Sequence, residues 1–513
     1  PYGLRVRLDG RTAIPKCAVS SVYGDSTSPG FNPLSVVADD PETTQNEATN
    51  TLYVTNLSRL AAEAGTTVEA VSARVVGAAA TGIMGTHGIN GVSAGILHVD
   101  DLPAWNTWNA NRCDLDARHG VVTAIGAAID QAIDDSGDSI EHIVIVGGDG
   151  VIPMAAVPDL TEYSNESTFA REVLTEAGAG NEAAAALASG FLLSDDPYAT
   201  DAGIEILGGD HELYVPKFGI GRLVEKYTEI GDQLDNFADF AGQLDPETFS
   251  PAAAVTTYDF LDDGGQAIVS ELAEAGFDVT ALLDQTDIDP EQVGVQQWTR
   301  ASFLELFENN DLSIVAPNAH YDFESLLPAA PDANGYFTDE QLVTTADVDA
   351  LDASAGFASL VFTVGCHAGL SVSDVQLDNP ALDWAQLNAQ GSNQFVAHTT
   401  YGYGDTEIVA YSERLAQLFA SNLGAMLDTE VNGPASLGQA VRDAKQRYLA
   451  GTLVLTPYDE KILQSWTYYG LPMYTLGDIV DDDTTSEATS TVAPLAGATT
   501  LDEESALVAG PAT

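Results

Sequence analysis

Short, continuous apolar runs alternate along the chain with longer stretches of helical spacing, and this alternation constrains the fold more than any other feature. HIVIVGG (142–148) is apolar throughout, as is typical of a parallel strand buried on both faces. It follows VVTAIGAAIDQAI (121–133), whose apolar residues recur at helical spacing. Repeated units of this kind place a mainly parallel sheet between two layers of helices. The sequence therefore predicts an α/β fold with three layers, αβα.

The expected strands fall into two series, which predict two adjoining, mainly parallel-sheet subdomains at 51–250 and 251–478. The first series comprises 51–56, 95–100, 142–148 and 218–223. The second comprises 252–260, 277–283, 312–320, 359–367, 393–401 and a last strand near 473–477. Residues 1–50 are predicted to form a loop-like N-terminal extension, and the Thr/Ser/Ala/Asp-rich residues 479–513 a low-complexity tail.

Charge excludes several classes of partner. The 513 residues carry 77 Asp and Glu against 18 Lys and Arg, a formal net charge of −59, while 45% of residues are hydrophobic. Nucleic acid and anionic membrane surfaces are unfavourable partners, because both are bound by clustered Lys and Arg. No apolar run approaches the ~18 residues needed to span a bilayer. Such acidity is typical of halophilic proteins, whose charge repulsion is screened by concentrated salt.

The three cysteines, Cys17, Cys113 and Cys366, are too few for a disulfide framework and have no zinc-site spacing. Cys366 stands at the end of the expected strand SLVFTVGCH, and His320 ends LSIVAPNAH. Successive strands of such sheets are usually neighbours, and sites form beyond their carboxyl ends. A thiol and an imidazole side by side there are the reagents of nucleophilic catalysis.

Three other motifs have structural interpretations. His367 is expected to be structural, because a side chain next to Cys366 on a strand points to the opposite face. GVSAG (91–95) matches the GxSxG elbow of serine hydrolases, but a strand follows it where the elbow needs a helix. GGDG (147–150) lacks the spacing of a phosphate loop and is expected to be a strand-ending turn.

Several segments resemble the gingipain family of cysteine peptidases, within the caspase-like clan. The segments are VFTVGCHAGL, LSIVAPNAHYD, HIVIVGGDGVIPM, SDDPYA, FGIGRL, SLGQAVRDAKQRYL and YYGLPMYTLG, so the resemblance covers about 50–478. It implies that 251–478 is a caspase-like catalytic unit that acts on protein or peptide substrates. It also implies an extracellular setting. No cofactor is required by this interpretation, and calcium, which gingipains bind, has no ligands that the sequence assigns.

The resemblance assigns roles to three residues at the two strand ends. Cys366 corresponds to the nucleophile, and His320 to the general base and acid. The N–H groups of Cys366 and of the residue after the histidine form the oxyanion hole in this family. That residue is usually Gly in the clan and is Tyr321 here, which puts the geometry of the loop in question.

Acidic residues after the strand that begins near 252 correspond to two further roles in the family. In TTYDFLDDGG (256–265), Asp259 resembles the acid that orients the histidine. Asp263 or Asp262 resembles the acid in the pocket for the P1 side chain. Each is interpreted equally well as turn and N-cap chemistry before a helix that starts near Gly264.

The same positions predict a preference for basic P1 residues. No Lys or Arg occurs between Arg300 and Arg414, so a cationic side chain would meet carboxylates without competition. A buried carboxylate favours Arg over Lys, because guanidinium forms a bidentate pair with it. The alternatives are a catalytically silent caspase-like surface or adhesion module and, more remotely, a GxSxG serine hydrolase.

Overall fold

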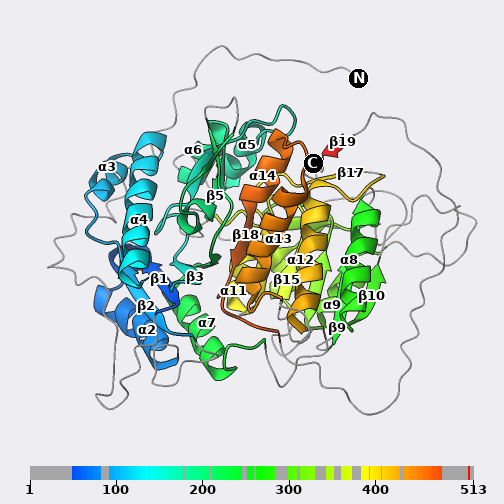
Figure 1. Cartoon of the computed structure of the whole chain (residues 1–513), viewed down its shortest axis with the longest axis horizontal. Coiled ribbons are helices and arrows are strands. Elements are labelled where there is room, and N and C mark those ends of the chain that lie inside the picture. The colour runs from blue at the N-terminus through cyan, green and yellow to red at the C-terminus, as the bar shows by residue number, and fades with distance from the viewer. Residues whose placement is uncertain are drawn as a thin grey trace, which may run out of the picture.

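The structure is a computed structural model that describes most of the chain between residues 49 and 476 (Figure 1). The described ranges are 49–82, 92–137, 139–176, 181–206, 211–244, 251–258, 261–282, 298–308, 312–329, 342–351, 360–372, 383–391, 393–405, 407–427 and 433–476, with the backbone of 506–508. Absences below refer to these ranges.

Ten strands form one central sheet in the order β10-β9-β11-β15-β16-β18-β8-β3-β1-β2. Their bounds are β1 Thr51–Thr55, β2 Ala94–His98, β3 His142–Val146, β8 Gly219–Leu223, β9 Ala252–Thr256, β10 Asp278–Leu282, β11 Ile314–Pro317, β15 Leu360–Phe362, β16 Gln394–His398 and β18 Trp466–Tyr469. Small antiparallel sheets lie beside it, formed by β12 (His320–Tyr321), β13 (Ser325–Leu327) and β14 (Val343–Thr344), by β4 (Ala155–Pro158) and β5 (Phe191–Ser194), by β6 (Ile204–Glu205) and β7 (Glu212–Leu213), and by β17 (Tyr403–Asp405) and β19 (Ala506–Val508).

The two predicted series of strands join edge to edge in the central sheet. Strands β1, β2, β3 and β8 are parallel to one another, as are β9, β10, β11, β15 and β16. The connecting strand β18 pairs with β8 in parallel, at Tyr469 and Arg222, and with β16 antiparallel. Strand direction therefore reverses at the joint, and the carboxyl ends of the two series point to opposite edges of the sheet.

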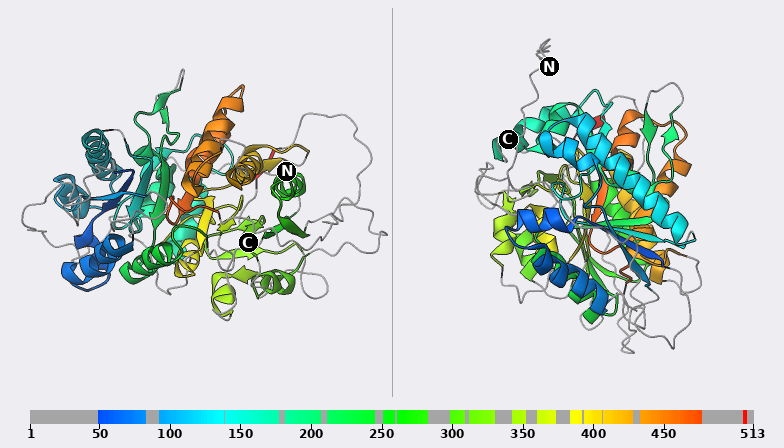
Figure 2. Two further views of the ribbon diagram at one scale, coloured as in Figure 1. Left: turned by 60° about the horizontal axis from the view of Figure 1, so that its bottom comes forward. Right: turned by 90° about the vertical axis from the view of Figure 1, so that its left-hand side faces the viewer.

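Helices cover both faces of the sheet and complete the three predicted layers (Figure 2). Along one face α2, α7, α11, α10 and α9 pack in succession, and α8, α12 and α13 pack along the other. The bounds are α1 Leu57–Glu63, α2 Val68–Gly82, α3 Ala104–Ala110, α4 Leu115–Asp135, α5 Glu166–Glu176, α6 Glu182–Ala188, α7 Tyr227–Asp239, α8 Asp262–Glu274, α9 Arg300–Glu308, α10 Thr345–Asp349, α11 Trp384–Gln390, α12 Tyr411–Leu427, α13 Leu437–Gly451 and α14 Pro457–Ser465.

Local sequence explains where these elements begin. Ser436 caps α13 by accepting the N–H of Gln439. Thr456 and Asp459 form a capping box at α14, with Pro457 at its first position. All five residues of β3 are buried, as the apolar run predicted.

The last strand differs from the prediction near 473–477. Strand β18 ends at Tyr469 because Gly470 adopts a positive φ of 135° and Pro472 follows. Thr475 makes only an isolated bridge with Gln243. Residues 1–48 lie outside the described ranges, and within 479–513 only the short strand β19 is described.

Candidate active site

The segments that bear Cys366 and His320 follow neighbouring strands of the sheet. Strand β15 pairs in parallel with β11, Leu360 opposite Ile314, so the two strands end at the same edge. Beyond their ends the segments are bonded to each other. Thr363 Oγ1 donates to the carbonyl of Pro317 at 2.6 Å, and the N–H of Val364 donates to Asn318 Oδ1 at 3.1 Å. The structure thus brings together the two loops that the sequence predicted to meet.

The two loops also pack directly against each other, at Gly365 and Tyr321. A Cβ added to Gly365 would lie 2.3 Å from Cδ2 of Tyr321, closer than any side chain tolerates. Tyr321 is buried, and its ring also packs edge-to-face on Trp384 with 5.5 Å between ring centroids. The residue after His320 therefore packs against the residue before Cys366.

Cys366 opens a turn after β15 rather than closing a strand, and its side chain is fully buried. The N–H of Gly402 donates to its Sγ at 3.3 Å, and Sγ lies 3.7 Å from the Gly402 carbonyl oxygen. Burial raises the pKa of the thiol to about 12, although the Gly402 N–H acts in the opposite direction. In this arrangement the sulfur is covered and protonated.

His320 does not end the strand as predicted: β11 ends at Pro317, three residues earlier, and His320 lies in β12, which pairs with β13. Its imidazole is partly exposed and meets the ring of Tyr258 edge-to-face, with centroids 4.8 Å apart. Tyr258 lies two residues beyond the end of β9, which is the other strand that pairs with β11. His320 is therefore partly accessible to solvent, although its Nδ1 is buried, whereas Cys366 is fully buried.

Two of the predicted acids, Asp262 and Asp263, lie at the N-terminus of α8. Asp259 lies outside the described residues. Asp262 accepts a hydrogen bond from Thr257 Oγ1, and both Asp262 and Asp263 occupy the first turn of the helix. Asp263 Oδ1 accepts the N–H of Gly264 at 2.9 Å. Hydrogen bonds at the start of α8 thus account for one carboxylate oxygen of each of these two residues.

Asp263 also faces a second carboxyl group, Glu413 of α12, which sequence reasoning did not single out. Burial and the charge of Asp263 raise the pKa of Glu413 to about 9, and burial raises the pKa of Asp263. Glu413 is 1% exposed, and its Oε2 accepts the N–H of Asp405 at 3.1 Å. The pair therefore holds a proton near neutral pH, so that it carries one negative charge rather than two.

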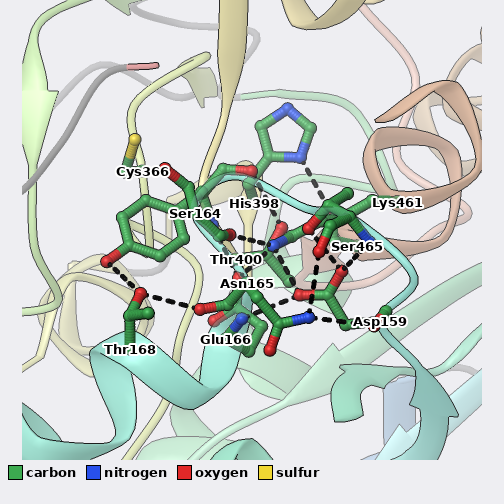
Figure 3. A network of polar contacts seen from close by, with 12 residues as sticks. Asp159, Ser164, Asn165, Glu166, Thr168, Cys366, His398, Thr400, Lys461 and Ser465 are labelled. Atoms are coloured by element: carbon green, nitrogen blue, oxygen red, sulfur yellow. Dashed lines mark hydrogen bonds and ion pairs between the residues drawn. The ribbon is translucent and has the colours of Figure 1, made fainter. Parts of the chain in front are cut away.

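A buried polar network lies behind the thiol and was also missed (Figure 3). His367 is fully buried, as a structural residue would be, but it adopts a positive φ of 55° in the turn rather than a strand conformation. Its Nε2 lies 2.9 Å from Oε2 of Glu166, from the first turn of α5. Glu166 comes some two hundred positions earlier in the chain, and no local pattern marks it.

The GxSxG match, the GGDG segment and Cys113 lie in elements of the fold away from a catalytic arrangement of their own. Ser93 directly precedes β2, so the segment lacks the strand–turn–helix order of a serine elbow. The GGDG segment ends β3 in a turn whose carbonyls accept hydrogen bonds from Arg59 and Arg222. Cys113 is disulfide-bonded, which the sequence analysis did not predict, and Cys366 is not part of a disulfide.

Within the described ranges, no group of three or more His, Cys, Asp or Glu is placed to hold a metal ion. Calcium therefore still has no assigned ligands. No helix in those ranges is long and apolar enough to cross a membrane.

The site thus belongs to an αβα protein with a cysteine and a histidine beyond adjacent parallel strands. The fold is similar to the crystal structure of the Arg-specific cysteine proteinase gingipain R, with a TM-score of 0.52 and 13% identity, covering 87% of this chain and 80% of that one. A complex of the pro- and mature domains of RgpB from Porphyromonas gingivalis gives 0.49 and 14%, covering 83% and 79%. The sequence matches no protein-family model and no curated protein. At this identity the likeness establishes the fold alone.

Proposed function

We propose that the protein is a cysteine endopeptidase with Cys366 as nucleophile and His320 as general base and acid. The observation that carries the proposal is the meeting of their two loops beyond β15 and β11, fixed by hydrogen bonds and by the packing of Tyr321 on Gly365. The gingipain-like fold supports a peptidase-like framework for that site.

The proposed reaction uses the chain's own groups. His320 takes the thiol proton, and Sγ of Cys366 attacks the scissile carbonyl carbon to form a C–S bond. The N–H groups of Cys366 and Tyr321 donate to the resulting oxyanion. When the intermediate collapses, the C–N bond breaks and His320 gives the proton to the leaving amine. Water then hydrolyses the thioester and regenerates the thiol. Asp259 is proposed to orient the imidazole.

Burial of the thiol sets a condition on this reaction. A pKa of about 12 leaves almost no thiolate at neutral pH, and a fully buried sulfur cannot meet a carbonyl carbon. Substrate engagement therefore has to uncover Cys366 and let the imidazole of His320 approach it. A covered resting site of this kind would keep the thiol unreactive until a peptide binds.

Specificity for basic P1 residues is proposed to come from the acids at the start of α8. Asp263 lies beside Glu413, and a guanidinium is drawn to such a pair because it neutralises buried negative charge. Asp262 is the other candidate for this contact. We propose cleavage after Arg and, less efficiently, after Lys, since Lys cannot make the bidentate pair.

Active-site labelling tests the proposal directly. A peptidyl acyloxymethyl ketone with Arg at P1 should label the wild-type protein at Cys366, and C366A should remain unlabelled. Peptide hydrolysis should fall by several orders of magnitude in C366A and H320A, because residues of one catalytic unit act together. The exposed His119 provides a matched control, since H119A should retain full activity. Full hydrolysis by C366A would refute the mechanism.

The main alternative is a catalytically silent surface or adhesion module of the same fold, and the buried, protonated thiol is the observation that favours it. A folded wild-type protein that neither labels at Cys366 nor cleaves any peptide of a P1-varied library would establish this alternative.

A further inference from the structure

A single carboxylate links the two segments that enclose the candidate thiol. Glu166 Oε2 lies 2.9 Å from Nε2 of His367, the residue bonded to Cys366 in the chain. Glu166 Oε1 accepts the N–H of Tyr401 at 3.1 Å, and Tyr401 is bonded to Gly402, whose N–H donates to Sγ. Both segments that touch or carry the sulfur are therefore tied to one side chain from the other strand series.

The surroundings hold the carboxylate in one place. Lys461 Nζ lies 2.7 Å from Glu166 Oε1 and 2.8 Å from Asp159 Oδ2, and it also donates to the carbonyl of Ser164 at 2.7 Å. The side chains of Glu166, Asp159 and Lys461 are at most 1% exposed. Figure 3 shows Cys366 at the rim of this network, with Lys461 and Asp159 on its far side. Asp159 and Glu166 together outnumber the one lysine, so the cluster keeps a negative charge.

The same carboxylate anchors a turn with an unusual backbone. His367 adopts a φ of 55°, in the left-handed region that few residues other than Gly adopt, although His, Asn and Asp are found there more often than others. Its N–H donates to the carbonyl of Thr400 at 2.7 Å, and its ring stacks on Phe169 of α5 with centroids 3.4 Å apart. The imidazole is thus clamped between Glu166 and Phe169, on the same helix, and the backbone beside the sulfur is fixed by that clamp.

We propose that Glu166 is a positioning residue for Cys366, which holds the 366–367 turn and the 401–402 segment around the sulfur through His367 and Tyr401. The inference rests on the proposed function, because positioning matters for a reacting thiol. A buried Lys in a chain with so few cations fits this role, since Lys461 compensates the carboxylate that the two segments need. Glu166 does not touch substrate and acts through its two neighbours.

Two substitutions separate the reach of Glu166 from its charge. E166D keeps the charge but is one methylene shorter, so it cannot bond both His367 and Tyr401. We expect kcat/KM for an Arg-P1 peptide to fall about 100-fold, the cost of a displacement near 1 Å. E166Q keeps the length and leaves Lys461 paired with Asp159. Removing a negative charge near the thiol should move the pH midpoint of Cys366 alkylation by iodoacetamide down by about one unit.

Glu182 provides the matched control. It is also a buried glutamate of the first strand series and is ion-paired, to Arg112, on a different helix. E182D and E182Q should lower the melting temperature without moving the alkylation midpoint, which is what a purely structural role would also give at position 166. C366A reports the background labelling of other cysteines. If E166D does not fold, the alkylation profile of E166Q decides alone.

The outcomes are distinguishable from failure of the proposed function. Alkylation by iodoacetamide needs only transient opening around the buried Cys366 and neither peptide binding nor turnover. A protein that fails to react with the peptidyl ketone and cleaves nothing would therefore still show the shifted iodoacetamide profile in E166Q. An unshifted profile in folded E166Q would overturn the positioning role, as would wild-type kcat/KM in folded E166D from an active enzyme.

Discussion

Replacement of Glu413 by Gln should reveal a pH-dependent penalty built into the fold. Glu413 is 1% exposed on α12, and a Cβ added to Gly264 would lie 2.7 Å from its Oε1, so the site has no room for solvent. Burial and the nearby Asp263 raise its pKa from 4.5 to about 9. The folded state therefore binds a proton that the unfolded chain releases above pH 4.5.

The sign of the effect follows from proton linkage. A carboxyl whose pKa is raised on folding contributes stability that is fully present below pH 4.5 and is lost as pH rises towards 9. Each pH unit in that window changes the free energy of unfolding by up to ~1.4 kcal/mol. Between pH 5 and pH 7 the wild-type protein should lose up to ~3 kcal/mol from this group. Gln mimics the protonated form, because it is uncharged at every pH and can still accept the N–H of Asp405.

Urea unfolding at fixed molar KCl measures this loss, since urea leaves the ionic strength unchanged. E413Q and wild type should have similar free energies of unfolding at pH 5. As pH rises to 8, the free energy of unfolding of E413Q should exceed that of wild type by a growing amount. Subtracting the free energy of unfolding of wild type from that of E413Q at each pH cancels the contributions of all other carboxylates, which the two proteins share. The exposed Glu407 supplies the control E407Q, whose carboxylate is in solvent in both states. A difference between E413Q and wild type that stays constant from pH 5 to 8 would show that Glu413 is not held protonated.

Three further perturbations test other parts of the account. Dilution from molar to dilute KCl should lower the melting temperature, because a net charge of −59 repels itself without screening, and an unchanged melting temperature would contradict a halophilic origin of the composition. D263N should raise KM for Arg-P1 peptides by at least about tenfold through loss of a charge-assisted pair, whereas a dominant apolar or acidic P1 preference in a peptide library would rule out the pocket. G365A should destabilise the protein by ~1–3 kcal/mol, because its Cβ would lie 2.3 Å from the Tyr321 ring. G77A, where a Cβ meets nothing within 4 Å inside α2, should be neutral or stabilising in the same unfolding assay.

Local pattern was sufficient for most elements. The all-apolar run at 142–146 became the buried strand β3, and the helical spacing at 121–133 lies within α4. Prediction was wrong where apolar residues continue through a break, as at the last strand. There WTYYGLPMYTL (466–476) is mostly apolar or aromatic, and only Gly470 and Pro472 show where β18 ends. Periodicity cannot locate such a boundary, because strand and turn carry the same residue types.

By itself the sequence determined the alternation of strand and helix, and it predicted Cys366 and His320 at the carboxyl ends of two successive strands, which are neighbours in the sheet. The alternation and the strand-end positions follow from residue type and from spacing over a few positions, because local sterics and burial decide strand and helix formation. The tertiary structure alone decided that β18 reverses the strand direction, that the thiol is covered, and that Glu166 and Glu413 lie against His367 and Asp263. The two glutamate contacts join residues more than a hundred positions apart, and they form because packing ten strands into one sheet brings such side chains together out of reach of solvent.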